Sequence, residues 1–345
     1  MTSSIAVTVI VPMRNEERCI ERCLKSILVN DFPKDQWEIL VADGMSTDHS
    51  RPIVAGLILS FPRIRMIDNP AKITSSGLNN GILQARGDVI IIMGAHSEYP
   101  DNYITTCMRE LEKTQADVVG GRLNTQPGAD TLVARTIALM SQHPFGVGPS
   151  AFRTGNVGKW VDTVPYGAYK REVFQRAGLF NEELARNQDY EFNARVRKAG
   201  GRLFLSPALE VAYYNVPNAK RLAVQAFNNG FWLPRMWYAC PASICIRHSL
   251  PLIFTVALLG GAVLSLFTSA GLVLLAVLLL AYGLAAGTAA MGIALHEGKQ
   301  YFFLLLGLFF IHHFIYGLGS LAGFFTVLPR RSHNAGPSLA ETAIH

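Results

Sequence analysis

The sequence lacks the motifs that mark several common ligand sites. Neither GxGxxG nor GxxxxGK[ST] occurs, which argues against a dinucleotide-binding Rossmann site and against a P-loop. The five cysteines, an odd number, form no CxxC pair. We therefore expect neither a zinc site nor a disulfide framework, and free thiols fit a reducing cytosol.

Clustered positive charge is also absent. The 31 Lys and Arg residues exceed the 25 Asp and Glu residues and give a net charge of +6, but they are scattered along the chain. No basic run is interleaved with aromatic residues, as it is in proteins that bind single-stranded nucleic acid. The charge balance therefore predicts no nucleic-acid partner and favours attraction to an anionic membrane surface.

Charge is missing altogether from a long stretch near the C-terminus. No Asp, Glu, Lys or Arg occurs between Arg247 and Glu297, and one helical crossing of a bilayer needs about 20 apolar residues. The apolar runs predict transmembrane helices over 250–267, 272–295 and 301–328. The residues before the first run are basic, whereas the turn after it is uncharged, so the N-terminal part is expected in the cytoplasm. The basic residues are Lys220, Arg221, Arg235 and Arg247.

The third predicted helix leaves two alternatives open. Three crossings would place Arg330 and Arg331 outside the cytoplasm, against the positive-inside tendency. Either the segment is re-entrant, or the other basic residues set the orientation in the membrane in spite of this pair. His312 and His313 inside the segment are costly in lipid, which favours their burial against the other helices.

In the N-terminal half, short apolar runs alternate with helical patterns. The runs predict strands at 7–11, 37–43, 64–68, 89–93 and 117–121, and further strands at 202–205 and 210–214. Helical patterns lie between the first five, at 16–28, 52–59, 76–85 and 102–113. This alternation predicts a mostly parallel α/β sheet flanked by helices, with right-handed crossovers. The first run is short, β-branched and closed by Pro12, typical of a strand rather than of a signal peptide.

Polar residues follow the predicted strands at the edge where such sheets bind ligands. They are, in order, Asn15 and Glu16, then Asp43, then Lys72, then His96 and Glu98. We expect Asp43 to face the crevice and accept hydrogen bonds from a base or ribose, because a charged group there ends a buried strand. The neighbouring Asp48 fits a helix cap as well as a binding role.

Two later segments carry further signals. Asp189 precedes a helix whose last turns hold Arg195, and a carboxylate at a helix start stays ionised yet accepts protons, so Asp189 is a candidate general base. An N-cap role is the alternative. Between 124 and 165 glycine and proline recur, which predicts either a mobile cover over the site or a plain surface loop. Segment 219–248 mixes aromatic and basic residues, typical of a membrane interface, with core packing as the alternative.

The stretches VTVIVPMRNEE, ADGMSTD, IIIMGAHSEYP and NQDYEFNARVRKAGG together resemble glycosyltransferase family 2. AHSEYPDNY, VDTVPYGAYKREVF and GLFNEEL are similar to its membrane-attached bacterial exopolysaccharide branch. The resemblance covers 5–250. It implies a GT-A fold, a nucleotide-diphosphate sugar donor such as a UDP-sugar, inversion at the anomeric carbon and a lipid-linked (polyprenyl diphosphate) sugar acceptor. The implied location is the bacterial inner membrane, multi-pass, with the catalytic domain in the cytoplasm.

Residue roles follow from the same resemblance. It assigns the catalytic base to Asp189, with Gln188 in place of the family's Glu, and the nucleoside contact to Asp43. The DxD motif expected after the fourth strand reads Gly94-Ala95-His96, so both carboxylates are missing. The predicted substrate-binding residues are Pro12, Asn15, Glu16, Asp43, Lys72, Gly167, Gln188 and Arg195.

The missing carboxylates bear on the metal. A departing diphosphate builds up negative charge that a metal or fixed cations must neutralise. His96 and Glu98 are the predicted ligands of a divalent metal, Mn2+ or Mg2+, and imidazole favours manganese. Lys72 would supplement the charge, and His312 or His313 would offer contacts to a lipid acceptor. A catalytically silent glycosyltransferase-like subunit of a membrane assembly complex is the alternative function.

These predictions divide the chain into four parts. A GT-A catalytic domain that binds a nucleotide-sugar covers 1–218, and an amphipathic interfacial segment covers 219–248. A transmembrane region of about three helices covers 249–329, and a disordered tail covers 330–345. The sequence predicts neither the sugar nor the linkage nor the oligomeric state.

Overall fold

The computed structural model describes residues 5–155 and 157–327. Within these ranges nine strands form one sheet in the order β3-β2-β1-β4-β8-β6-β9-β5, and β7 pairs with β9. The strands are β1 (Val7–Met13), β2 (Trp37–Asp43), β3 (Ile64–Asp68), β4 (Val89–Ile92), β5 (Ser97–Glu98), β6 (Val118–Gln126), β7 (Lys159–Trp160), β8 (Ala168–Lys170) and β9 (Leu203–Tyr214).

The first five predicted strands are confirmed as β1, β2, β3, β4 and β6. The pair predicted at 202–205 and 210–214 is one strand, β9, which pairs along β6 with a register shift beside Gly120. The sheet is mixed, because β8 runs antiparallel to β4 and β6, and β5 and β7 run antiparallel to β9. Strands of two or three residues carry too few side chains to show a period in the sequence.

The register brings the ends of the first three strands together. Met13, Asp43 and Asp68 are partners across β1, β2 and β3, which run parallel to one another. The loops that leave these strands therefore start at the same edge of the sheet, where parallel sheets bind ligands. β1 and β2 are almost wholly buried, as expected for strands covered on both faces.

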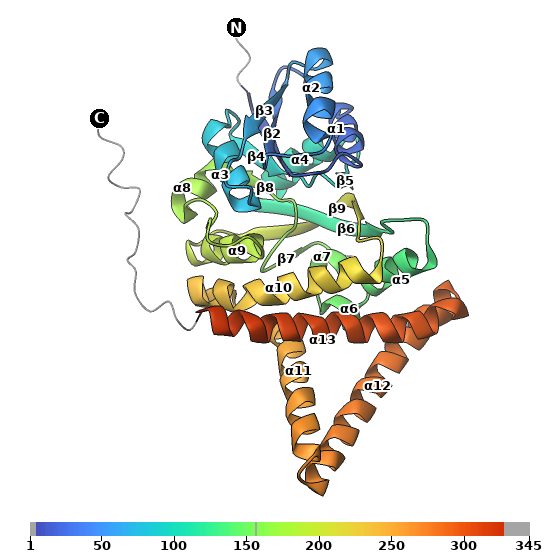
Figure 1. The fold of residues 1–345 in the computed structure, drawn as a ribbon. Coiled ribbons are helices and arrows are strands. Elements are labelled where there is room, and N and C mark those ends of the chain that lie inside the picture. The colour runs from blue at the N-terminus through green and yellow to red at the C-terminus, as the bar shows by residue number, and fades with distance from the viewer. Residues whose placement is uncertain (1–4, 156, 328–345) are drawn as a thin grey trace.

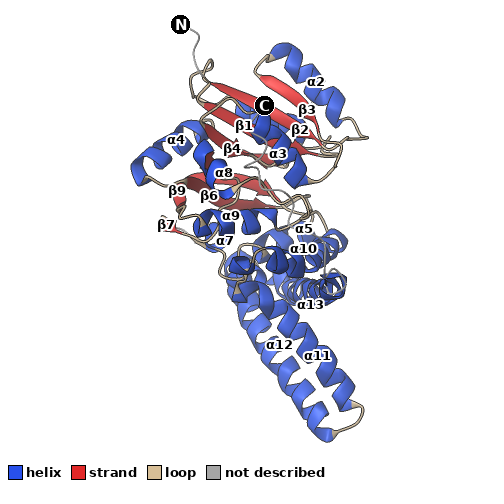
Figure 2. Ribbon diagram, turned by 90° about the vertical axis from the view of Figure 1, so that its left-hand side faces the viewer, coloured by secondary structure: helices blue, strands red, loops and turns tan. Residues whose placement is uncertain are grey.

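Helices cover both faces of the sheet (Figures 1 and 2). Those of the sheet region are α1 (Ile20–Leu28), α2 (Ser50–Ser60), α3 (Thr74–Gln84), α4 (Tyr103–Thr114), α8 (Arg171–Ala177) and α9 (Gln188–Lys198). The segment predicted as irregular, 124–165, contains three short helices that lie between the sheet and the C-terminal helices. They are α5 (Leu132–Met140), α6 (Pro144–Val147) and α7 (Ala151–Thr154).

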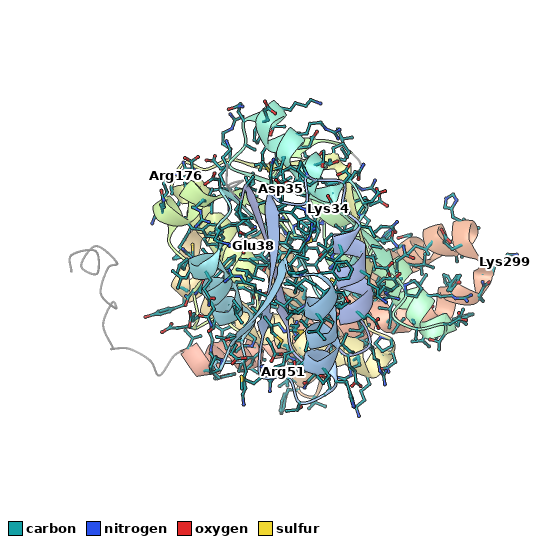
Figure 3. The ribbon with its side chains drawn as sticks, turned by 90° about the horizontal axis from the view of Figure 1, so that it is seen from above. Lys34, Asp35, Glu38, Arg51, Arg176 and Lys299 are labelled. Carbon is teal, nitrogen blue, oxygen red and sulfur yellow. The ribbon has the colours of Figure 1, made fainter. Side chains whose placement is uncertain are left out.

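The C-terminal helices form a platform and a hairpin. The platform consists of α10 (Ala219–Ala239) and α13 (Phe302–Val327), which lie side by side beneath the sheet (Figures 1 and 2). The hairpin consists of α11 (Ile246–Ser265) and α12 (Ser269–Glu297) and projects away from the platform, and two short 3-10 turns, η1 (Pro241–Ser243) and η2 (Lys299–Tyr301), flank it along the chain. Seen from above, Lys299 lies well outside the outline of the sheet, and α13 returns from there beneath it (Figure 3).

Three helical stretches among the described residues are long and apolar enough to cross a membrane, namely 246–265, 269–297 and 299–327. The first two form the hairpin that projects from the platform, whereas α13 runs crosswise to it (Figure 1). The predicted tail, 330–345, and the pair Arg330 and Arg331 lie outside the described residues.

Two glycines let the platform helices approach backbone to backbone. A Cβ added at Gly319 would lie 2.1 Å from the carbonyl oxygen of Phe227, and one at Gly323 would lie 2.3 Å from that of Phe231. Both pairs are spaced by four residues, so one face of α13 fits against one face of α10 over a full turn. Small residues at this spacing are how helices pack closely in membranes.

We predict that Gly319→Ala destabilises the protein, because the added methyl group meets a carbonyl oxygen in a contact that cannot relax. The expected loss is about 1–3 kcal/mol of unfolding free energy, seen as a lower thermal midpoint of the purified chain in detergent. Gly307→Ala on the same helix is the matched control, since nothing lies within 4 Å of its added Cβ. Equal midpoints for the two variants would contradict the close packing of α10 on α13.

Candidate active site

A cavity of about 660 Å³ extends from the carboxyl edge of the sheet to the platform. Seven of the predicted site residues line it, and they come from five different parts of the chain. They are Pro12, Glu16, Lys72, His96, Gly167, Gln188 and Asp189. The remaining four, Asn15, Asp43, Glu98 and Arg195, are not among the lining residues.

Asp189 is one of the lining residues and comes from the first turn of α9. α9 begins at Gln188 with Asn187 in the N-cap position, so Asp189 lies inside the first turn and the N-cap alternative is wrong. Burial raises the pKa of the Asp189 carboxyl above its ordinary value, while the backbone amide of Tyr190 and the charge of Arg153 hold the rise back. A carboxylate with a raised pKa is a stronger base, which suits proton abstraction.

The next turn of α9 anchors this carboxylate. The Asn193 side chain donates to Thr163 Oγ1 at 2.8 Å and accepts from the Tyr169 hydroxyl at 3.3 Å. The helix is thereby tied to β8 and to the segment before it. Tyr169 and Asp189 are close enough that the carboxylate charge adds to burial in raising the pKa of the Tyr169 hydroxyl.

The hydrogen bonds of Arg195 hold its own helix in place. Its guanidinium pairs with Glu191 at 2.6 Å, one turn earlier on α9, and donates to the carbonyl oxygen of Leu179 at 2.8 Å. These contacts fix α9 against the loop that precedes it. Arg195 is not among the residues that line the cavity, and its predicted contact with substrate stays a prediction.

The side chains of Asp43 and Asn15 also form hydrogen bonds within the loops at the sheet edge. The Asp43 carboxylate is fully buried, and Arg51 and the backbone amide of Ser46 donate to it, the latter at 3.2 Å. It does not face the crevice as expected, and a nucleoside would reach it only after Arg51 moved. Asn15 accepts from the backbone amide of Thr47 at 2.8 Å and so joins the loops after β1 and β2.

The structure explains why the DxD motif is missing its first carboxylate. A Cβ at Gly94 would lie 2.5 Å from the hydroxyl oxygen of Tyr166, so the tyrosine fills the space that an aspartate side chain would need. Tyr166 lines the cavity and adopts φ of +46°, a left-handed conformation that is costly for a residue with a side chain. Only the fold brings these two residues together.

The carboxylate beside His96 is Glu16, not Glu98. Glu16 Oε1 lies 3.6 Å from His96 Nδ1, and both residues line the cavity. Glu98 pairs with Arg22 at 2.7 Å, outside the lining. The predicted pairing of His96 with Glu98 as metal ligands is thus replaced by a pairing of His96 with Glu16.

These two side chains fit a metal that is shared with substrate. The described residues contain no group of three or more His, Cys, Asp or Glu side chains able to hold an ion. Mg2+ and Mn2+ in sites that handle phosphates take one or two protein ligands and complete their shell with phosphate oxygens and water. His96 and Glu16 would supply those two positions if such an ion is bound.

Basic side chains outnumber acidic ones along the cavity. The carboxylates are those of Glu16 and Asp189, and the cations are those of Arg14, Lys72, Arg153 and Arg186. Within the described part of the chain none of these four cations is in an ion pair, so their charge is available to an anionic ligand. Arg153 also stacks on the Tyr213 ring, which His96 meets edge to face, so these three lining residues form one connected cluster.

Sequence reasoning missed Arg153 and Arg186 because both lie in segments without a regular pattern. Arg14 directly follows the first strand, so its position carried a signal that was available. Arg153 sits on the short α7, whose place under the sheet follows from tertiary packing. No spacing in the sequence relates it to Asp189.

Comparison with known proteins identifies the family. The family described as Glycosyl transferase family 2 matches residues 8–178. The chain is 31% identical over 233 residues, 65% of its own length and 71% of the other protein, to a dolichyl N-acetyl-alpha-D-glucosaminyl phosphate 3-beta-D-2,3-diacetamido-2,3-dideoxy-beta-D-glucuronosyltransferase of Methanococcus voltae. It is 30% identical over 254 residues, 72% of its length and 76% of the other, to succinoglycan biosynthesis protein ExoA of Rhizobium meliloti.

A solved structure confirms the expected fold. The mannosyltransferase PcManGT from Pyrobaculum calidifontis, in complex with GDP-Man and Mn2+, superposes with a TM-score of 0.59 over 96% of this chain and 89% of that one, at 19% identity. The predicted GT-A type of α/β fold is thereby confirmed. Because two relatives at 30% identity or above are matched over more than two thirds of their length, the chain belongs to glycosyltransferase family 2 and is a glycosyltransferase.

Proposed function

We propose that this enzyme is an inverting glycosyltransferase that moves a sugar from a nucleotide-diphosphate donor, a UDP-sugar in the first instance, to a lipid-linked acceptor. One observation carries the proposal: a carboxylate of raised pKa, Asp189, opens on the same cavity as four cations that form no ion pair within the described residues. A base and an anion site in one cavity are what transfer from a diphosphate requires. The names of the Methanococcus voltae and Rhizobium meliloti relatives support a glycan-building role.

In this proposal the donor lies at the sheet edge. Arg14 and Lys72, beyond β1 and β3, face the diphosphate, and Pro12 and Gly167 belong to the cavity wall around the nucleotide. His96 and Glu16 would hold a divalent ion there, which would supply further neutralisation of the diphosphate charge. Fixed cations cost no reorganisation when charge develops, so they stabilise the leaving group directly.

The acceptor reacts on the opposite side of the sugar. Asp189 takes the proton of an acceptor hydroxyl while that oxygen forms a bond to the anomeric carbon and the bond from this carbon to the phosphate oxygen breaks. The electron pair leaves with the nucleoside diphosphate, and the configuration inverts. One carboxylate is enough, because a phosphate leaving group needs no protonation, unlike the alcohol released in glycoside hydrolysis.

The C-terminal helices place this chemistry at a membrane. We propose that the hairpin of α11 and α12 crosses the bilayer and returns, and that α10 and α13 lie along the surface beneath a catalytic domain in the cytoplasm of a bacterial cell. Large apolar side chains are exposed along the hairpin, as lipid contact requires, for example Val263, Leu272, Leu280 and Leu284. Two crossings remove the conflict with the positive-inside tendency that three would raise.

We predict that Asp189→Asn abolishes transfer but leaves the donor site intact, because an amide of the same shape accepts no proton. Transfer of label from a nucleotide-sugar into the organic phase is expected to fall about 100- to 10,000-fold, with nucleotide affinity by calorimetry unchanged. Asp130→Asn, an exposed carboxylate outside the cavity, serves as the control. Undiminished transfer by Asp189→Asn would remove this residue from the base role, and silence of the wild type with every donor would favour the assembly-subunit alternative.

The raised pKa of Asp189 predicts an acid limit to activity. The base must be deprotonated, so single-turnover transfer is expected to fall as pH drops through the folded-state pKa, which lies above the ordinary value of 3.8. The fall should begin at a higher pH than an exposed aspartate would give. A rate that stays constant down to pH 3.8 would contradict the assignment, provided circular dichroism shows the protein still folded there.

The pairing of His96 with Glu16 predicts which carboxylate governs the metal requirement. We expect chelation to lower wild-type transfer, and Glu16→Gln to raise the Mn2+ concentration for half-maximal activity about 10- to 100-fold. Glu98→Gln should leave that concentration unchanged, since Glu98 contacts Arg22 instead. Equal Mn2+ requirements in the two variants would remove Glu16 from the metal site. Transfer that is insensitive to chelation would show that fixed cations alone neutralise the diphosphate.

A further inference from the structure

The platform end of the cavity is lined by polar side chains that the donor does not use. Four of them come from the two platform helices and the start of the hairpin: Asn229 from α10, His248 from α11, and His312 and Tyr316 from α13. We call these four residues the cavity floor. None belongs to the sheet region that family members share at 8–178.

Two atoms of the floor are buried without a hydrogen-bond partner in the part of the chain that the structure describes. They are His248 Nδ1 and His312 Nδ1. A buried polar atom left unpaired costs about 1–3 kcal/mol, so retaining two of them in one cavity points to a ligand that pairs with them. The mechanism above gives neither histidine a task.

The chemistry of the floor differs from that of the sheet edge. Its groups are imidazole, phenol and amide, which donate and accept hydrogen bonds, whereas Arg14 and Lys72 lie with the loops of the sheet edge. Aromatic rings stand beside these groups, because Tyr190 meets His248 edge to face at 4.8 Å between ring centroids. Such a lining suits the hydroxyl groups and apolar faces of a sugar, and none of the four floor residues carries the guanidinium or ammonium group that a phosphate would call for.

The position of the cavity floor in the molecule indicates which substrate it receives. The floor belongs to the helices from which the hairpin leaves for the bilayer, so a lipid-borne molecule arrives from that side (Figure 1). Asp189 lines the same cavity on α9, which lies between the sheet and α10 (Figure 1). A sugar resting on the floor would therefore have the base between itself and the donor.

We propose that the cavity floor is the acceptor subsite, where His248, His312 and Tyr316 hold the terminal sugar of a lipid-linked glycan by its hydroxyl groups and direct one of them to Asp189. The inference rests on the proposed function. It adds which part of the acceptor is recognised, namely its terminal sugar, and which residues recognise it. The acceptor is recognised through its sugar, and its lipid serves to bring it to the platform.

The chain offers a matched control for His312. His313 is the next residue of α13, but its Nδ1 lies 3.0 Å from the Tyr282 hydroxyl, and it does not line the cavity. His312→Phe and His313→Phe therefore make the same change on the same helix. Only the first removes a group from the cavity floor, whereas the second removes a hydrogen bond between helices.

The test uses the full chain in detergent, a donor that supports wild-type transfer, and an organic extract of bacterial membranes as the acceptor. His312→Phe and Tyr316→Phe are expected to raise the half-saturating amount of extract about tenfold, the effect of losing one hydrogen bond of about 1.4 kcal/mol. The half-saturating donor concentration should stay unchanged. His313→Phe should leave both quantities at their wild-type values.

A second measurement does not depend on turnover. Lipids that copurify with the wild type, His312→Phe and His313→Phe are extracted and identified by mass spectrometry. Loss of sugar-bearing lipids from His312→Phe alone supports the subsite, even if the wild type transfers no label and the proposed reaction fails. The subsite is overturned if sugar-bearing lipids are absent from the wild type or equal in both variants, or if His312→Phe changes donor saturation instead of acceptor saturation.

Discussion

The close contact between α10 and α13 is the constraint on which the lower half of the molecule depends. Gly319 and Gly323 let the two backbones approach until carbonyl oxygens lie where a methyl group would be. At Gly230 the relation is reversed, because a Cβ there would lie 2.0 Å from the carbonyl oxygen of Tyr316. The same approach places Asn229 and Tyr316 together at the end of the cavity. Helix packing and ligand recognition are thus one arrangement here.

Electrostatics divides the cavity into regions with different tasks. Unpaired cations suit an anionic donor, and their excess over two carboxylates is what a diphosphate would compensate. In the proposed role of base, Asp189 keeps a raised pKa in spite of these neighbours, because burial disfavours its charged form more than Arg153 favours it. Stronger pairing with a cation would make the carboxylate easier to keep ionised but a weaker acceptor of protons. The environment of Asp189, with burial and only a weak influence from a cation, therefore fits the reaction better than an ion pair would.

Residues that look catalytic in the sequence divide into those that touch the cavity and those that hold the elements which touch it. Asp43, Asn15 and Arg195 are polar residues at the predicted places, yet their hydrogen-bonding groups are used by Arg51, Thr47 and Glu191. A sequence shows that a residue can bind a ligand, but it does not show whether another residue of the protein already occupies its hydrogen-bonding groups. Glu98 illustrates the same point, since it forms an ion pair with Arg22 from α1.

The sequence by itself determined the alternating strands and helices, the resemblance to glycosyltransferase family 2, the apolar C-terminal run and the place of Asp189 at the start of a helix. Periodicity and motif spacing are local properties of the chain. Only the tertiary structure decided that Glu16 accompanies His96, that Tyr166 fills the space beside Gly94, and that α13 lies crosswise beneath the sheet. Each of these depends on which distant segments become neighbours. Long-range packing makes that choice, through close contacts such as the one at Gly319, and no local pattern records it.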